Sequence, residues 1–260
     1  MVKEPDPLTH AYWKTERAKF HLDSLREEVA AFCKNSHTIT VQEQPERDQV
    51  RYKVELKQPH VYIFLILGDV LQCLRTALDQ AVWSLIHHRT GEDPQSSEFP
   101  IFAEPLDAEE RKKFNRKVKG LSDEAIAYIE SIQPYNRRTG ADPSSHPLWC
   151  LHELNRIDKH RRISVTPQLV VAGRHHFGVS PPRADFQSMV SERTDYGLDV
   201  LCTGSYKHFQ PKVTSLVQFG EQESGIALTI DEIAQIYNFV ADEVLIRLAG
   251  FANLGNAKAV

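Results

Sequence analysis

The sequence has few cysteines and no long apolar segment. No two cysteines have the spacing of a redox motif or a zinc site; they are Cys33, Cys73, Cys150 and Cys202. The longest uninterrupted apolar run is Val61–Leu67, far short of the roughly 20 residues that span a bilayer. The N-terminal residues MVKEPDPLTH contain no apolar core of a secretory signal. We therefore expect a soluble cytoplasmic protein with reduced cysteines and no membrane segment.

The chain also lacks a strong excess of either charge. Its 260 residues carry 31 Lys and Arg against 35 Asp and Glu, which gives a net charge of -4. This balance argues against a uniformly basic nucleic-acid-binding protein, but it leaves room for a local basic patch. With 41% apolar and 25% charged residues, the composition is that of a globular protein and excludes a disordered tail.

Common cofactor and metal motifs are missing from the sequence. The 12 histidines include no HExxH pattern, and no Walker, GxGxxG or GxSxG pattern is present. A metal site needs convergent ligands at matched spacing. The sequence therefore predicts neither a metal site nor a cofactor.

Apolar periodicity divides the chain into helical and strand-forming parts. Repeats at three- and four-residue steps, together with start and stop signals, predict helices over about 8–33, 60–88, 107–117, 122–133, 147–161 and 230–252. Alternation at a period of two predicts a β-hairpin over 38–56, and β-branched runs predict several antiparallel strands over 163–228. Segregated runs of helices and strands indicate an α+β fold, a helical bundle with a hairpin and a second antiparallel sheet in the C-terminal half.

We expect a single domain over 1–260. Its helical part covers about 8–161, its β-rich part covers about 162–229, and a closing helix covers 230–252. Three residues have the sequence context of helix N-caps: Asp107, Ser122 and Thr229.

The predicted helix over 60–88 carries polar residues where its apolar pattern is interrupted. At about 100° per residue, one stripe contains Gln72, Arg75 and Asp79 between apolar ends. Arg75 and Asp79 are four residues apart and can form an ion pair. The stripe is either a polar site lined by these three residues or a solvated face with one salt bridge.

The predicted helix over 147–161 shows a similar interruption. Asp158 and Arg161 point into the apolar arc of this helix, and Asn155 borders the arc. One hypothesis joins the two helices: Arg75 and Asp79 pair with Asp158 and Arg161 across a helix–helix interface. Such a network is either purely structural or the floor of a functional site.

The end of the same helix, HELNRIDKHRR, is dense in groups that can perform chemistry. His160 is a candidate general base, Asp158 a candidate orienting residue, and Lys159 and Arg161 candidate anion contacts. Together with Arg75, they would make a hydrolytic site. The structural alternative is a basic last turn that offsets the helix dipole.

Two stretches of the chain also resemble known families. GDVLQCLRTALDQAVW and LHELNRIDKHRR, with EFPIF between them, are similar to motifs of a group of uncharacterised bacterial proteins. The first stretch resembles the R-x4-H signature of HEPN-like helical domains, and Arg75 matches its arginine. That resemblance implies an RNA-cleaving enzyme and a homodimer built on the first two long helices. Gln80 stands where the signature has histidine, so His160 would have to supply the imidazole.

A basic stretch lies within the predicted helix over 107–117 and just after it. Phosphate contacts, including contacts to RNA, are predicted for Arg111, Lys112, Lys113, Arg116 and Lys117. The alternative is the solvated face of an amphipathic helix. Taken together, the sequence favours a protein that binds a partner or small ligand through the charged centre around Arg75. A HEPN-like RNA-cleaving or other hydrolytic enzyme is the alternative.

Overall fold

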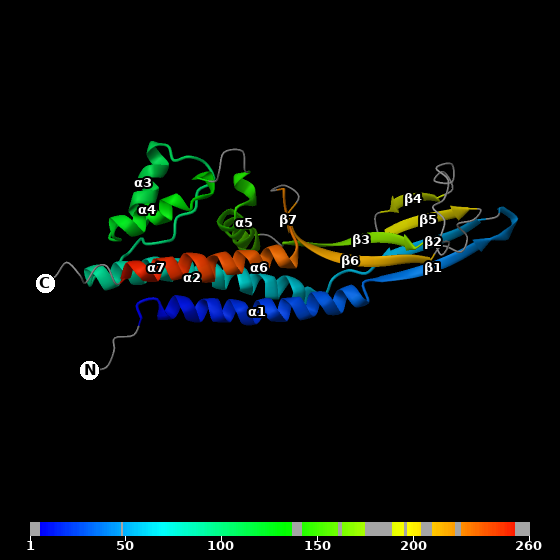
Figure 1. The fold of residues 1–260 in the computed structure, drawn as a ribbon, viewed down its shortest axis with the longest axis horizontal. Coiled ribbons are helices and arrows are strands. Elements are labelled where there is room, and N and C mark those ends of the chain that lie inside the picture. The colour runs from blue at the N-terminus through cyan, green and yellow to red at the C-terminus, as the bar shows by residue number, and fades with distance from the viewer. Residues whose placement is uncertain are drawn as a thin grey trace. The chain divides into compact units, whose positions relative to one another are not determined.

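The computed structural model describes residues 6–47, 49–136, 142–160, 163–174, 189–194, 197–203, 210–221 and 225–252. Its main helices are α1 (Thr9–Lys34), α2 (Val61–Thr90), α3 (Ala108–Lys117), α4 (Asp123–Ser131), α5 (Pro147–His160), α6 (Ile230–Asn238) and α7 (Leu245–Ala252). Its strands are β1 (His37–Gln44), β2 (Gln49–Leu56), β3 (Ser164–Arg174), β4 (Met189–Thr194), β5 (Gly197–Thr203), β6 (Gln210–Glu221) and β7 (Ile226–Leu228) (Figure 1). The predicted α+β fold is confirmed.

The helix starts follow the capping signals in the sequence. The side chain of Asp107 accepts hydrogen bonds from the backbone N–H groups of Glu109 and Glu110 at the start of α3. Ser122 caps α4 in the same way. Thr229 and Glu232 form a complete capping box at the start of α6. Each cap satisfies backbone donors that the helix itself leaves free, which is why these short polar residues fix the helix starts.

The predicted hairpin is present, and it belongs to a larger sheet. Strand β1 pairs with β2 in an antiparallel register that sets His37 opposite Leu56 and Gln44 opposite Gln49. The other edge of β2 pairs with β5, so the four-stranded sheet has the order β1-β2-β5-β4. A second sheet has the order β3-β6-β7. The sequence predicts the strands, but the pairing of β2 with β5 is a tertiary contact between distant residues. Its register sets Gln49 opposite Thr203.

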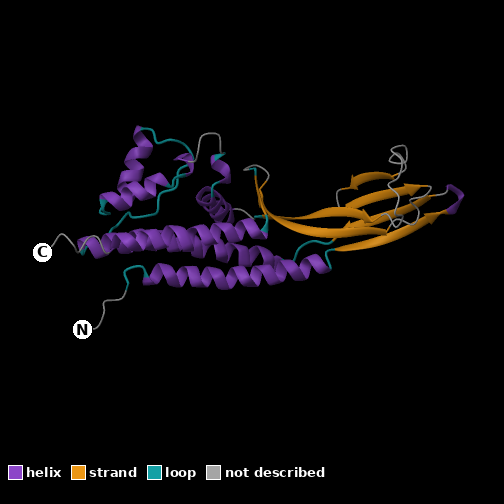
Figure 2. Ribbon diagram, in the orientation of Figure 1, coloured by secondary structure: helices purple, strands orange, loops and turns teal. Residues whose placement is uncertain are grey.

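The chain divides into two compact units. Unit 1 contains residues 1–26, 64–164 and 219–260, and unit 2 contains residues 27–63 and 165–218. Helices make up most of unit 1, and strands make up most of unit 2 (Figure 2). The single domain expected from the sequence stays a prediction.

The core of unit 1 forms around α2. Its inward face is fully buried at Leu67, Val70, Leu71, Leu74 and Leu78. Helix α1 packs along α2 with Ala11, Ala18, Leu22 and Leu25 buried, as its apolar stripe predicts. By length and composition α2 could cross a membrane, but half of its most apolar window is buried inside the protein. Core helices of soluble proteins share this property, so the absence of a membrane segment stays a prediction.

The predicted closing helix contains a segment of different winding. Between α6 and α7 the backbone is π-helical over Phe239–Val244. Five of the buried side chains along the combined helix lie at intervals of four residues, at Ile236, Val240, Val244, Leu248 and Ala252. In a regular α-helix each such interval rotates the side chain by about 40° around the axis. A π-segment turns less per residue, so it keeps these side chains on one face.

Candidate functional site

The charged stripe of α2 centres on a buried arginine. The guanidinium of Arg75 is 7% exposed, and its Nη2 donates to Asp79 Oδ1 at 2.8 Å and to the backbone oxygen of Phe99 at 2.7 Å. The same nitrogen lies 3.3 Å from Glu98 Oε1. The predicted Arg75–Asp79 ion pair is confirmed. We call Arg75, Asp79, Glu98, Lys117 and His152 the charged centre.

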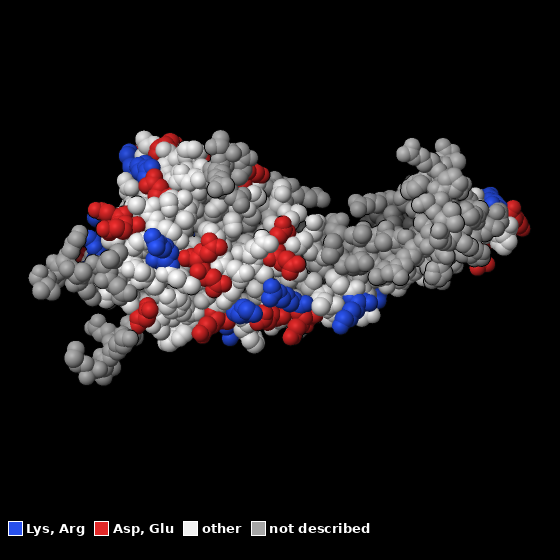
Figure 3. All heavy atoms as spheres, viewed as in Figure 1, with Lys and Arg blue, Asp and Glu red and all other residues white. Residues whose placement is uncertain are grey.

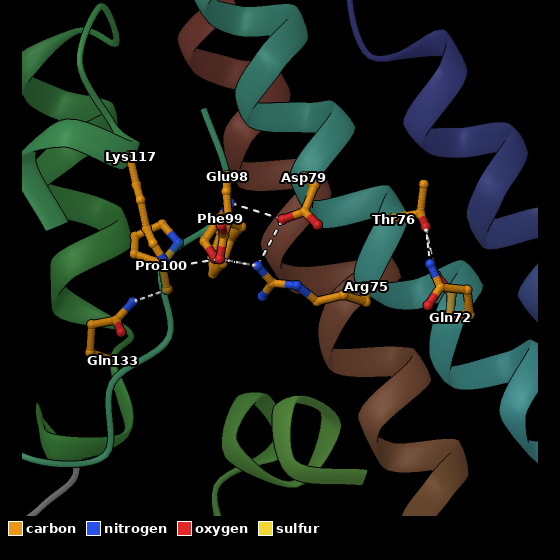
Figure 4. A network of polar contacts seen from close by, with 9 residues as sticks. All are labelled: Gln72, Arg75, Thr76, Asp79, Glu98, Phe99, Pro100, Lys117 and Gln133. Carbon is orange, nitrogen blue, oxygen red and sulfur yellow. Dashed lines mark hydrogen bonds and ion pairs between the residues drawn. The ribbon is translucent and has the colours of Figure 1, made fainter. Parts of the chain in front are cut away.

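The charged centre holds an extended segment of backbone against α2. Asp79 Oδ1 accepts a hydrogen bond from the Phe99 N–H at 3.0 Å, so Arg75 and Asp79 together bind both backbone groups of Phe99. From the opposite side, Gln133 donates to the Pro100 carbonyl at 3.0 Å (Figure 4). Gln133 also accepts a hydrogen bond from the Phe102 N–H at 2.9 Å. These bonds fix the EFPIF segment while the Phe99 ring is fully buried. One part of the centre is therefore structural.

A second cation joins the centre from α3. Lys117 Nζ lies 2.7 Å from Glu98 Oε1, so this carboxylate contacts two cations. Partial burial opposes ionisation of Glu98, but the hydrogen bond and charge of Lys117 outweigh it, and the pKa of Glu98 is lowered. Burial raises the pKa of Asp79, and the charge of Arg75 and the Phe99 N–H offset this only in part.

The centre also contains a histidine that the sequence analysis missed. His152 lies on α5, where burial and the positive charges of Arg75 and Lys117 lower its pKa and favour the neutral imidazole. Its ring lies 5.8 Å from the ring of Trp149. His152 precedes Asn155 by three residues, a spacing that places both on one side of the helix. This three-residue spacing is the sequence signal that could have identified His152 as a member of the centre.

Helices α2 and α5 face each other, but not with the predicted partners. A Cβ atom on Gly68 would lie 2.7 Å from Asp158 Oδ2, so this carboxylate sits directly over the glycine. Gly68 is seven residues, or about 10 Å along the helix, from Arg75. The residue of α5 near Arg75 is His152, which makes the two helices antiparallel. The predicted ion pair between Arg75 and Asp158 is therefore wrong, because the register of the two helices differs by about two turns.

Asp158 has its own electrostatic surroundings. Its side chain is exposed, and its pKa is raised by partial burial and by the nearby charge of Asp69. Arg161, its predicted ion-pair partner, lies outside the described residues. Lys159 and His160 are both exposed at the end of α5. The catalytic role assigned to His160 and Asp158 stays a prediction.

Two other predicted site residues, Gln72 and Asn155, lie in different surroundings, one exposed and one buried. Gln72 is exposed, donates to Thr76 Oγ1 at 3.2 Å, and points away from the contacts of Arg75 (Figure 4). Asn155 is buried, and its Oδ1 has no hydrogen-bond partner among the described residues. Arg75 Nη1 is also buried and has no hydrogen-bond partner among the described residues. Unpaired buried polar atoms are uncommon, and here one lies on α2 and one on α5.

The basic stretch of α3 is partly neutralised. Arg111 pairs with Glu130 at 2.6 Å, Lys112 pairs with Glu109 at 2.8 Å, and Lys117 pairs with Glu98. Lys113 and Arg116 are exposed. On the face drawn in Figure 3, basic and acidic side chains are intermixed. The predicted phosphate contacts would therefore compete with carboxylates at three of their five positions.

Metal-ligating groups are scattered over the described ranges. Among those residues, no three His, Cys, Asp or Glu side chains are close enough to hold a metal ion. Cys33 and Cys73 are free thiols. Burial raises the pKa of Cys33 and Cys73, which favours the unreactive thiol form at these two positions.

Comparison with known proteins gives no relative. No family model, curated protein or solved structure matches this chain. The resemblance to the bacterial group and to HEPN-like domains stays a prediction from the motifs around Arg75 and in α5.

Proposed function

We propose that this protein acts by binding a partner or small ligand at the charged centre. Side chains from α2, α3, α5 and the segment after α2 converge there, although they are far apart in sequence. The buried Arg75 holds the carboxylates in fixed positions, as a preorganised binding site requires. The charged centre is therefore a cluster built from several segments and not a single ion pair on the surface of one helix.

The observation that carries the proposal is the unequal exposure of the two charge signs. Arg75 and Lys117 are 7% and 20% exposed, whereas the side chains of Asp79 and Glu98 are 35% and 45% exposed. The hydrogen bonds and ion pairs of these carboxylates use Asp79 Oδ1 and Glu98 Oε1. Among the described residues, Asp79 Oδ2 and Glu98 Oε2 therefore remain as acceptors for a ligand that carries hydrogen-bond donors.

A titration with two small probes tests the proposal. Methylguanidinium represents a cationic ligand, inorganic phosphate represents an anionic one, and amide chemical shifts report where each binds. We expect methylguanidinium to shift amides near Asp79 and Glu98 in a saturable way, and Asp79→Asn to weaken this binding about tenfold, since a charge-assisted hydrogen bond is lost. Lys113→Gln, on the exposed side of α3, is the matched control. Shifts spread evenly over the surface for both probes would remove the proposal.

A hydrolytic enzyme is a second candidate, and His152 favours it. This imidazole is held near Arg75 in the neutral form that a general base needs. Cleavage of single-stranded RNA by the wild type, His152→Gln and His160→Gln separates the two histidines. Loss of cleavage in His152→Gln alone would support this candidate. Equal background cleavage in all three proteins would exclude it.

A further inference from the structure

An exposed tryptophan lies beside the charged centre. Trp83 follows Asp79 by four residues on α2, so the two side chains are neighbours on one face of the helix. Its indole is 39% exposed and stacks on His87, with ring centroids 4.9 Å apart and an interplanar angle of 8°. The stacking holds the ring in place while part of the indole remains open to solvent. Large exposed aromatic side chains of this kind are enriched at interfaces.

Carboxylates lie on both sides of this ring along the helix. Asp79 lies one turn before Trp83, and Glu98 contacts the same Arg75 nitrogen as Asp79. One turn after Trp83, His87 Nδ1 lies 3.1 Å from Asp93 Oδ1, and Asp93 is exposed. Asp79 and His87 are eight residues apart, which corresponds to about 12 Å along α2. The loop after α2 thus returns along the helix and places one acidic group at each end of the indole.

This arrangement has the chemistry that recognises basic side chains. The face of an indole attracts a guanidinium or ammonium group, and a neighbouring carboxylate adds a charge-assisted hydrogen bond. The cations of the centre are its less exposed members, so the centre presents mainly carboxylates beside the exposed part of Trp83. In an extended peptide, side chains four residues apart are separated by about 13 Å, which matches the distance between the two acidic ends.

We propose that Asp79, Trp83, Asp93 and Glu98 form a docking surface, the acidic–aromatic patch, for a basic segment of a partner protein. Two Lys or Arg side chains of that segment bind the two acidic ends, and one of them also stacks on Trp83. This inference rests on the proposed binding function and names its partner class. It extends the binding surface beyond the charged centre to Trp83 and Asp93.

Fluorescence anisotropy with a labelled heptapeptide tests this inference. The probe carries arginine at its second and sixth positions and glycine elsewhere, and the control peptide carries glutamine in place of both arginines. We expect binding at low salt by the arginine peptide only. Trp83→Leu should weaken it about tenfold, in keeping with a desolvated cation–π contact and lost ring area, and Asp93→Asn should weaken it severalfold. Trp13→Leu, which removes a more exposed tryptophan on α1 (60% against 39% exposed), is the control.

The outcomes separate this inference from the proposed function. If Asp79→Asn loses binding while Trp83→Leu and Asp93→Asn bind as the wild type does, the charged centre stands and the patch is excluded. If Trp13→Leu loses as much affinity as Trp83→Leu, the peptide binds non-specifically and the patch is also excluded. A wild-type dimer that Trp83→Leu converts to a monomer in light scattering would assign the surface to a second copy of the chain instead. Absence of both peptide binding and methylguanidinium shifts would remove both proposals.

Discussion

At the scale of single residues, Arg75 has both a structural and an electrostatic role. Its Nη2 bonds the Phe99 carbonyl and Asp79, which in turn bonds the Phe99 N–H. Replacing both residues of a buried ion pair with apolar residues can leave the free energy of unfolding nearly unchanged. Removing only one of them leaves the other charge buried without a partner, which destabilises the protein. The stability of the EFPIF segment therefore depends on the intact Arg75–Asp79 pair.

We expect Arg75→Ala to destabilise the protein by about 3 kcal/mol, because it leaves a buried carbonyl and a half-buried carboxylate without their donor. Denaturant unfolding followed by circular dichroism measures the change. Arg116→Ala, on the exposed side of α3, serves as the control and should change stability by less than about 0.5 kcal/mol. Equal effects of the two substitutions would contradict the structural role of Arg75.

His152 should make stability depend on pH. Its pKa is lowered in the folded protein by burial and by Arg75 and Lys117, whereas the unfolded chain has the ordinary value of about 6.5. The unfolded state thus binds the proton more tightly, so stability is lost as pH falls through about 6.5 towards the folded-state pKa. Thermal unfolding between about pH 7 and pH 5 should show a smaller loss for His152→Gln than for the wild type. Identical pH profiles would show that the environment of His152 does not disfavour its charged form.

At the scale of elements, the winding of the last helix follows from its buried side chains. The π-segment Phe239–Val244 acts as one extra residue that keeps Val244, Leu248 and Ala252 facing the core. Removing one exposed residue from that segment would restore steps of four, three, four and four residues between the buried positions. Those steps fit a regular α-helix.

Deletion of Asp242, which is exposed within the π-segment, should therefore leave the helix folded with its buried face intact. Deletion of Arg247, equally exposed but in the α-helical part, should be the more destabilising change, because it rotates Leu248 and Ala252 by about 100° away from the core. Melting temperatures of the two deletion variants test this order. The reverse order would show that the π-segment is itself required.

At the scale of the whole molecule, a single domain should unfold in one cooperative step. Helices are concentrated in unit 1 and strands in unit 2, so helix and strand signals report on different parts of the chain. Calorimetry, together with infrared bands for helix and strand, should show coincident transitions. Two separate transitions would show that the units are independent domains and would contradict the single domain predicted from the sequence.

Much of the architecture follows from local patterns that a sequence makes visible. The spacing of Arg75 and Asp79 on one helix is enough to predict their ion pair, because helical neighbours at four residues meet in any context. The caps at Ser122 and Thr229 depend only on the next three residues. In each case the interacting groups are held together by the covalent chain.

The rest of the centre could not be predicted, because its members meet only after folding. The contact of Arg75 with Glu98 crosses 23 residues of sequence, and His152 comes from yet another helix. The hypothesis about Asp158 identified the correct pair of helices but the wrong register. That register is set by packing, since Gly68 leaves room for the Asp158 carboxylate at one position of α2.

Local patterns in the sequence are enough to predict the helices, the hairpin and the Arg75–Asp79 pair, because these depend on periodicity and on short-range hydrogen bonds. Tertiary packing fixes which carboxylates of the centre face outward, which histidine lies near Arg75, and the pairing of β2 with β5. These features depend on burial and on long-range packing. Burial determines which charges of the centre face the solvent, and in the charged centre those are the carboxylates of Asp79 and Glu98.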